Sequence, residues 1–137
     1  MNDDSLSDAF RAVARRMREA SREALAPWDV TPAQARALGI LLRTDPQRIG
    51  DLAQRLRIAA RSATEVVDAL QDRGLVARSP DPADRRATLV GATARGAEVG
   101  AAIRAARAAE SENVFHVLSD DDRAHLARIL AVLNAEP

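Results

Sequence analysis

The N-terminal part of the chain has apolar side chains at helical spacing. Leu6, Phe10, Val13 and Met17 recur every three or four residues, while arginines occupy another side of the same helix. This pattern predicts a long amphipathic helix that ends at Pro27. A second helix is predicted from Thr31 to near Thr44, because Thr31-Pro32-Ala33-Gln34 is a capping box with proline at the first helical position.

Two shorter helices follow, with a tight turn at residues 57–60 between them. Their apolar side chains are Ile49, Leu52, Ala53 and Leu56 in the first, and Ala63, Val66, Val67 and Leu70 in the second, which stops at Gly74. Residues 74–90 then place two strand-like runs around a tip that carries three charges, which predicts a β-hairpin. Helices and hairpin together describe a winged helix-turn-helix, so DNA is the first partner to test.

Two further helices are predicted after the hairpin. Thr93 is a suitable N-cap for a long, alanine-rich helix, and Ser119 with acidic residues 120–122 caps a last helix with apolar residues Leu126, Ile129, Leu130 and Leu133. The outer helices are too amphipathic to be linkers, so we expect them to pack together and against a second copy. The predicted fold is mainly α with a small β-hairpin wing, in one intertwined domain. Residues 1–30 form an N-terminal dimerisation helix and connector, 31–92 the winged helix-turn-helix lobe, and 93–137 the C-terminal dimerisation helices.

The composition supports assembly and excludes several kinds of chemistry. The 137 residues include three aromatic side chains, Phe10, Trp28 and Phe115, so a monomer would have a thin core and oligomerisation is the usual remedy. The chain has no cysteine, which excludes disulfides, thiolate metal ligands and thiol-based redox sensing. No stretch approaches the roughly 20 apolar residues that cross a bilayer, and the N-terminus is acidic, so we expect a cytoplasmic protein without membrane contact.

Charge is distributed unevenly along a chain whose net charge is zero. Residues 48–95 contain nine arginines against six acids, residues 1–47 contain seven of each, and residues 96–137 contain four arginines against seven acids. The middle of the chain is therefore the basic part, and only local charge has to meet phosphate.

Five motifs in order resemble the MarR family of winged-helix regulators. They are Asp51–Leu56, Thr64–Leu70, Gly74–Val76, the Asp-Arg-Arg wing signature in Pro82–Arg86, and Thr93 with Gly96 at the start of a helix. The resemblance implies a homodimer with interlocked terminal helices and two lobes on successive major grooves of a near-palindromic site. It also implies a ligand cleft between the dimer helices and each lobe.

The chain departs from the family pattern in the predicted recognition helix. Family members often carry Ser or Thr where Ala59 stands, and Arg at the positions of Glu65 and Ala69. The helix has thus lost an N-cap and positive charge, so DNA affinity is expected to rest more on the wing than is usual in the family.

Candidate DNA contacts lie on the outer face of the fourth helix and at the wing. Arg61 and Ser62 occupy the first turn, where base contacts are made, Thr64 follows, and Glu65 could accept from cytosine N4. The alternative is that Arg61 and Glu65, four residues apart, pair with each other on a solvated face. At the wing the candidates are Arg85 and Arg86; by the resemblance Arg86 enters the minor groove and Asp84 orients it. An exposed turn that only improves solubility is the alternative.

The sequence also contains candidate residues for a ligand pocket, and two histidines that could be metal ligands. The family's cleft is built from the elements that hold Phe10, Arg15, Met17, Trp28 and Leu38, so these residues are the candidates for binding an aromatic ligand. His116 and His125 lack a third obvious ligand, so no metal site is expected, and no cofactor is implied.

The function expected from these patterns is a homodimeric DNA-binding regulator of transcription, a repressor that a small aromatic or lipophilic ligand could release. The alternative is a winged-helix protein-interaction module, favoured by the neutral net charge and by Glu65, Asp68 and Asp72 on the fourth helix. An enzyme is not expected, because no phosphate-binding glycine loop and no catalytic arrangement around either histidine is present.

Overall fold

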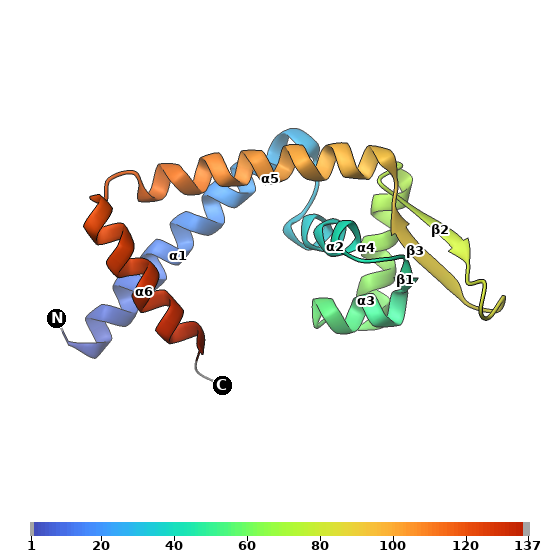
Figure 1. Cartoon of the computed structure of the whole chain (residues 1–137), viewed down its shortest axis with the longest axis horizontal. Coiled ribbons are helices and arrows are strands. Elements are labelled where there is room, and N and C mark those ends of the chain that lie inside the picture. The colour runs from blue at the N-terminus through green and yellow to red at the C-terminus, as the bar shows by residue number, and fades with distance from the viewer. Residues whose placement is uncertain (1, 136–137) are drawn as a thin grey trace.

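The computed structural model describes residues 2–135 and has the form of an arch (Figure 1). Helices α1 (Asp3–Leu25) and α5 (Ala94–Phe115) lie against each other along the span, and α6 (Asp120–Ala135) stands at one end. A lobe of short elements forms the other end. No helix among the described residues is long and apolar enough to cross a membrane.

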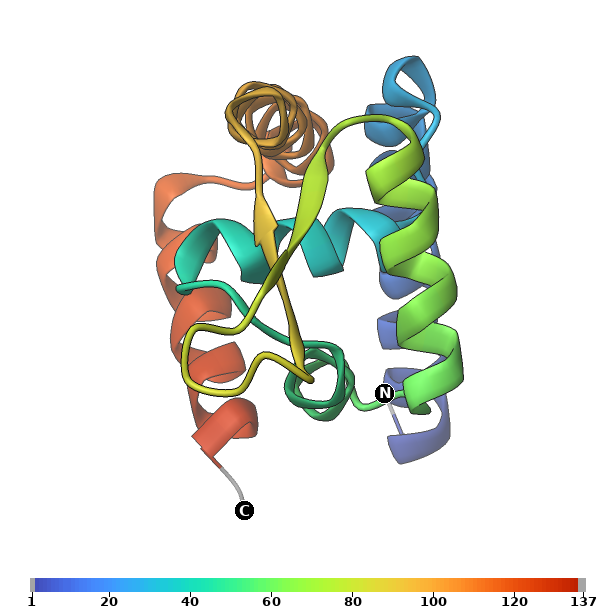
Figure 2. The same ribbon diagram turned by 90° about the vertical axis from the view of Figure 1, so that its right-hand side faces the viewer.

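The lobe contains three helices and a small sheet. Helices α2 (Pro32–Arg43), α3 (Ile49–Leu56) and α4 (Ala60–Asp72) surround strands β1 (Gln47–Arg48), β2 (Val76–Pro80) and β3 (Thr88–Ala92). Figure 2 looks at the lobe end-on and shows α2 lying across the space between the sheet and α4. A 3₁₀ turn, η1 (Ala26–Trp28), joins α1 to the lobe, and the next residue, Asp29, has a positive φ of 51°.

Side-chain caps fix the starts of three helices, as the sequence predicted. At α2, Gln34 N donates to Thr31 Oγ1 and Thr31 N donates to Gln34 Oε1, both at 3.1 Å. Gly96 N donates to Thr93 Oγ1 at the start of α5, and Asp122 N donates to Ser119 Oγ at the start of α6. These bonds satisfy amide groups that a helix start leaves without partners, so the local sequence sets these boundaries.

The start of α4 differs from these three. Ala59 is its N-cap and offers no side-chain hydrogen bond, as the missing Ser or Thr predicted. The helix begins at Ala60, the last residue of the predicted turn. Arg57 gives the turn its direction with a positive φ of 56°, and the Arg36 side chain on α2 donates to the carbonyls of Leu56 and Arg55 at 3.0 and 3.3 Å.

The sheet has three antiparallel strands in the order β1-β3-β2, whereas the sequence predicted only the hairpin of β2 and β3. Strand β1 has two residues, too few to show a period of two in the sequence. It exists because Arg48 pairs with Leu89 of β3, which in turn pairs with Ser79 of β2. This register determines which residue of β1 lies near the root of the wing.

The hydrophobic core lies in the lobe and its junction with α5. Its fully buried members include Leu38, Leu52, Val67, Leu70 and Val90, and α5 adds Val99 and Ile103. In contrast, no described residue of α6 is buried, and α1 buries only Ala24 and Leu25 at its lobe end. Helices α1 and α6 therefore leave several large apolar side chains exposed in the single chain.

Candidate nucleic-acid interface

The outer face of α4 is anchored by its inner face. Ala63, Val67 and Leu70 are fully buried, which turns Arg61, Ser62, Thr64 and Glu65 toward solvent. The Arg61 Nε lies 4.0 Å from Glu65 Oε1, and the two side chains are 93 % and 72 % exposed. The predicted alternative, pairing along the helix, is thus present in the structure, but so loosely that both groups remain accessible.

The acidic character of α4 is partly neutralised by the wing. Asp68, predicted to face outward, accepts from Arg78 Nη2 of β2 at 2.6 Å, and Gln71 accepts from the same guanidinium. The Asp68 side chain remains 58 % exposed. Because a basic side chain of β2 covers part of its charge, α4 presents less negative charge to a partner than its sequence suggested.

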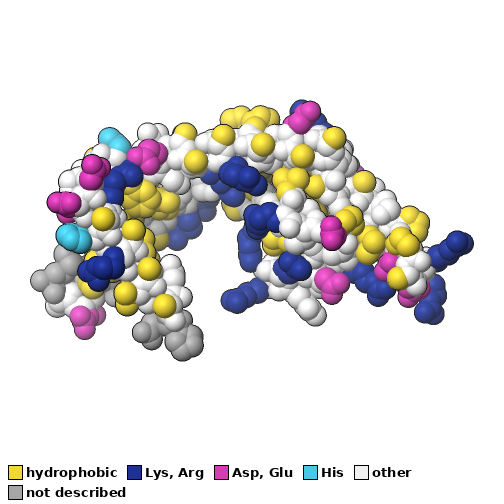
Figure 3. All heavy atoms as spheres, in the orientation of Figure 1, with side chains coloured by type: hydrophobic (Ala, Val, Ile, Leu, Met, Phe, Trp, Pro, Cys, Tyr) yellow, Lys and Arg dark blue, Asp and Glu magenta, His cyan; other side chains and the backbone are white. Residues whose placement is uncertain are grey.

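The wing tip displays Arg85 and Arg86 in solvent. Asp81 N donates to Ala87 O at 3.0 Å and closes the loop between β2 and β3. At the tip, Asp84 Oδ1 accepts from both Arg86 N (3.1 Å) and Arg86 Nε (3.2 Å), while the Arg86 side chain stays 92 % exposed. Asp84 thus holds the Nε edge of the Arg86 guanidinium and leaves Nη1 and Nη2 available. The wing end of the lobe in Figure 3 carries a group of basic side chains with acidic ones among them.

The recognition helix and the wing point to the same end of the lobe. Figures 1 and 2 both place the wing loop and the beginning of α4 at the lower end, with α3 between them. The exposed residues of both elements can therefore meet one extended surface. This arrangement is what a winged helix needs in order to contact two neighbouring grooves of a duplex.

Two ion pairs that the sequence did not predict hold these elements in place. Arg48, at the end of β1, pairs with Asp81 at the root of the wing, with Nη2 and Oδ2 3.0 Å apart. Arg73, just after α4, donates to the Asp29 carbonyl and, at 3.2 Å, to its carboxylate. The partners lie 33 and 44 residues apart, so no spacing rule could have found them.

The Arg48–Asp81 pair also sets the charge state of the wing root. The pKa of the Asp81 carboxyl is lowered, first by the hydrogen bond from Ala83 N–H and then by the bond from Arg48. The same bond raises the pKa of Arg48, which stays charged at any working pH. Because the folded pKa of Asp81 lies below its unfolded value, its contribution to stability is present above the usual aspartate range and is lost as the pH falls through the lowered pKa.

The five candidate ligand residues are not gathered into a pocket in the single chain. Leu38 is 1 % exposed and belongs to the core, where α5 packs on it, so it offers little surface to a ligand in the single chain. Trp28 is half-buried against the same core, Phe10 is 59 % exposed, and Arg15 and Met17 lie along α1.

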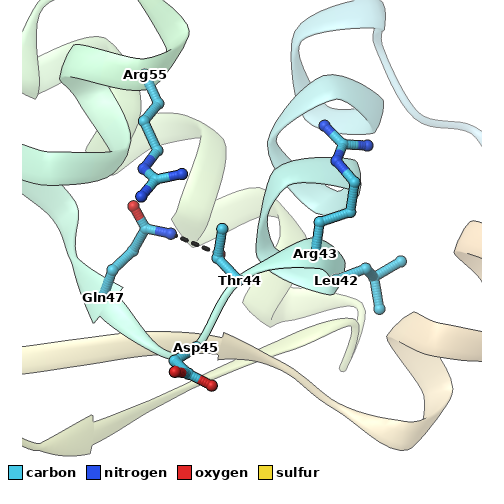
Figure 4. A pocket seen from close by; sticks show the side chains of 6 residues that line it. All are labelled: Leu42, Arg43, Thr44, Asp45, Gln47 and Arg55. Atoms are coloured by element: carbon cyan, nitrogen blue, oxygen red, sulfur yellow. Dashed lines mark hydrogen bonds between the residues drawn. The ribbon is translucent and has the colours of Figure 1, made fainter.

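The larger described cavity, of about 540 Å³, lies elsewhere in the lobe, between the end of α2, β1 and α3 (Figure 4). Its polar lining includes Arg43, Asp45 and Arg55, and Gln47 Nε2 donates to Thr44 Oγ1 at 2.7 Å. A smaller cavity of about 190 Å³ lies between the ends of α5 and α6 and is lined mainly by apolar side chains. None of the candidate ligand residues lines either cavity.

The two histidines lie apart from this surface. His116 Nδ1 is 2.7 Å from the Asn113 carbonyl at the end of α5, and His125 is exposed on α6. Within residues 2–135, no group of three or more His, Cys, Asp or Glu side chains is placed to hold a metal ion.

Comparison with known proteins identifies the family. The MarR family model matches residues 30–88, the part of the chain that runs from α2 to the wing. A transcriptional regulator of the helix-turn-helix type from Mycobacterium leprae is 38 % identical over 102 residues, which cover 74 % of this chain and 68 % of that protein. The chain belongs to the MarR family. This MarR-family chain is therefore a helix-turn-helix transcriptional regulator and not an enzyme, as the sequence predicted.

Further similarities extend over nearly the whole MarR-family chain. The transcriptional repressor MdtR of Bacillus subtilis is 26 % identical over 133 residues, covering 97 % of this chain and 84 % of that protein. A mutant MarR of E. coli superposes with a TM-score of 0.83 at 25 % identity, covering 93 % of this chain and 95 % of that one. A mutant MepR of S. aureus bound to an oligodeoxyribonucleotide superposes with a TM-score of 0.74 at 23 % identity, covering 93 % and 97 %. The winged-helix fold expected from the sequence is thereby confirmed.

Proposed function

We propose that this regulator is a homodimeric repressor that binds a near-palindromic operator in the cytoplasm. The observation that carries the proposal is the common orientation of two exposed elements: the first turns of α4 and the Arg85–Arg86 tip lie at one end of the lobe. In this proposal α4 enters a major groove and the wing follows into the adjacent minor groove.

The side chains of α4 have the chemistry to contact base edges. Arg61 can donate to guanine O6 and N7, Ser62 can contact either base of a pair, and Glu65 can accept from cytosine N4. Thr64 donates to the Ala60 carbonyl at 3.0 Å and is exposed, so its methyl group is free to meet a thymine methyl. We assign base contacts to these four residues.

The wing supplies a second cationic contact beside that of Arg61 on α4. Arg86 is exposed, held at its Nε edge by Asp84, and free of any acid beyond that neighbour among the described ion pairs. An arginine of this kind fits a narrow minor groove, where the negative potential is strongest. The mutant MepR of S. aureus, which shares the fold, is bound to an oligodeoxyribonucleotide, and this supports DNA as the partner.

The exposed apolar face of the outer helices supports a dimer. Side chains on α1 and α6 that are between 42 % and 60 % exposed would be covered by the same helices of a second copy; they are Leu6, Phe10, Val13, Ile129, Val132 and Leu133. Contiguous apolar surface of this kind marks an interface. A two-fold dimer would place the two lobes on half-sites about 34 Å apart, and the operator would share that symmetry.

Ligand release would act through the distance between the lobes. A small aromatic or lipophilic molecule that binds better to a dimer with mismatched lobe spacing shifts the population away from the DNA-binding form. We assign its site to Phe10, Arg15, Met17, Trp28 and Leu38, a site that a second copy of the chain would have to complete. The name of MdtR, a repressor, supports the direction of regulation.

The alternative of a protein-interaction module has lost part of its support. It relied on the neutral net charge and on acids along α4, and one of these acids, Asp68, pairs with Arg78 of the wing. Steep salt-dependent binding to duplex DNA would support the repressor, and no binding at low salt would support the module.

The test of the DNA-binding surface is the variant Arg86→Ala. Loss of one cationic contact should weaken binding to a selected genomic operator about tenfold and reduce the slope of log affinity against log salt by roughly 1, measured by fluorescence anisotropy. Sedimentation should show an unchanged dimer.

The matched control is Arg95→Ala, which removes the same charge from the start of α5 at the opposite end of the lobe. It should bind as the unmodified protein does. If Arg86→Ala and Arg95→Ala behave alike, the wing contact is wrong.

A further inference from the structure

The wing root is tied to the start of α3 by a shielded ion pair. Arg48 Nε and Nη2 both donate to Asp81 Oδ2, at 3.3 and 3.0 Å. The Asp81 side chain is 13 % exposed, the smallest value for any acid in the ion pairs of residues 2–135. Such a pair is less weakened by salt than the exposed pairs elsewhere in the chain.

The sheet register explains how two residues so far apart in sequence meet. Arg48 lies opposite Leu89, and Leu89 lies opposite Ser79. Asp81 follows Ser79 by two positions, so both side chains lie on the same side of the strand. The Arg48 side chain therefore spans β3 and reaches the point where the chain leaves β2 for the wing tip.

Two successive hydrogen-bonded turns, joined by the peptide bond between Ala83 and Asp84, connect Asp81 to Arg86. Asp81 Oδ1 accepts from Ala83 N at 2.9 Å, and Ala87 N donates to Asp84 O at 2.9 Å. Asp84 then holds Arg86 through both its backbone and its side chain. Pro82, between Asp81 and Ala83, has a fixed φ. Movement of Asp81 would therefore move Arg86 with it.

We propose that Arg48 and Asp81 are positioning residues that set the angle of the wing and so place Arg86 against DNA. Without the pair, the hairpin stays joined to the lobe through the β-ladder but can pivot about it, and Arg86 samples orientations that miss the groove. The inference rests on the proposed function, because the position of Arg86 matters only if Arg86 contacts DNA.

A double-mutant cycle tests the proposal. Arg48→Gln breaks the ion pair and leaves the turn between Asp81 and Ala83 intact. Arg86→Ala should weaken operator binding about tenfold in the unmodified protein, but less than about threefold in the Arg48→Gln background, where the wing no longer presents the guanidinium. Asp81→Asn, which keeps an oxygen for Ala83 N–H but loses the charge, should show the same coupling to Arg86→Ala.

The matched control is Arg55→Gln, the same substitution on α3 at an arginine that has no ion-pair partner among the described residues. Its effect should add to that of Arg86→Ala without coupling. Additive losses for Arg48→Gln as well would mean that Arg48 only contacts phosphate, and would overturn the positioning role.

A second readout does not need DNA. Backbone order parameters of residues 83–87 from nitrogen-15 relaxation should fall in Arg48→Gln and stay unchanged in Arg55→Gln. If Arg86→Ala costs no affinity in the unmodified protein, the wing contact of the proposed function fails, and these order parameters still decide whether the pair holds the wing. Unchanged order parameters of residues 83–87 in Arg48→Gln would show that the Arg48–Asp81 pair does not hold the wing in place.

Discussion

At the scale of single residues, two glycines show how differently one residue type can be used in this fold. A Cβ on Gly96, in the first turn of α5, would lie 2.1 Å from the Leu75 carbonyl oxygen and 3.3 Å from Leu38 Cδ1. A Cβ on Gly50, in α3, would meet nothing within 4 Å. The first glycine permits α5 to approach the root of the hairpin, and the second has no packing role.

This difference predicts opposite effects of the same substitution. Gly96→Ala should lower the free energy of unfolding by about 1–3 kcal/mol, because a backbone carbonyl cannot move aside as a side-chain end can. Gly50→Ala should raise it by about 0.4–1 kcal/mol, because alanine restricts the unfolded chain. Urea denaturation at equal protein concentration measures both, and equal midpoints for the two variants would contradict the close contact.

The sequence predicted contacts between residues that are close along the chain, but not the contacts that depend on strand pairing in the sheet. The Asp84–Arg86 contact joins neighbours within one motif, so the motif suggested it. The Arg48–Asp81 pair depends on the register of β1 with β3, and β1 is too short to predict. The burial of Leu38 was not predictable for a similar reason: helical spacing shows that a residue is apolar and on a face, but not which neighbour covers that face.

At the scale of elements, helix starts were predictable because they are encoded within four residues. Thr31, Thr93 and Ser119 cap their helices as expected, and Ala59 fails to cap α4 as expected. The recognition helix thus begins with amide groups that no side chain satisfies. Its position is maintained from outside, by Arg36 at the preceding turn and by Arg73 just after its last residue.

The missing cap predicts a stabilising substitution. Ala59 has φ −64° and ψ 149°, the backbone geometry of an N-cap, so Ala59→Ser should raise the free energy of unfolding by about 1 kcal/mol. The urea midpoint is the measurement. Ala101→Ser, the same change at an exposed position inside α5, should bring no gain; a similar gain there would argue against capping as the cause.

At the scale of the whole molecule, the lobe has a buried core, whereas the outer helices lack packing partners for some of their apolar side chains within the single chain. The buried core serves α2, α3, α4 and the sheet, whereas α6 leaves apolar side chains in solvent along its length. The scarcity of aromatic residues predicted that a monomer would have a thin core, but the sequence did not show which elements would lack packing partners. In the structure these elements are the outer helices, far from the proposed DNA surface.

This distribution predicts that one charge on α1 separates the dimer without unfolding the lobe. Phe10→Glu would place a carboxylate where the second copy must bury apolar surface, so it should shift the protein to a monomer in sedimentation equilibrium. Ala33→Glu adds the same charge to an exposed position of α2 and should leave the dimer intact. A Phe10→Glu protein that remains dimeric would place the dimer interface elsewhere.

Helix α5 has a consequence for the kind of operator that such a dimer can use. It runs for 22 residues without a break, buried in the lobe at one end and leading to α6 at the other. At a rise of 1.5 Å per residue it is about 33 Å long. In a dimer joined through the outer helices, the distance between the two lobes would depend on this length and on the angle at which each α5 leaves the two-fold axis. Adding or removing a turn of α5 would then change the operator spacing that the dimer can use, without changing any side chain that touches a base.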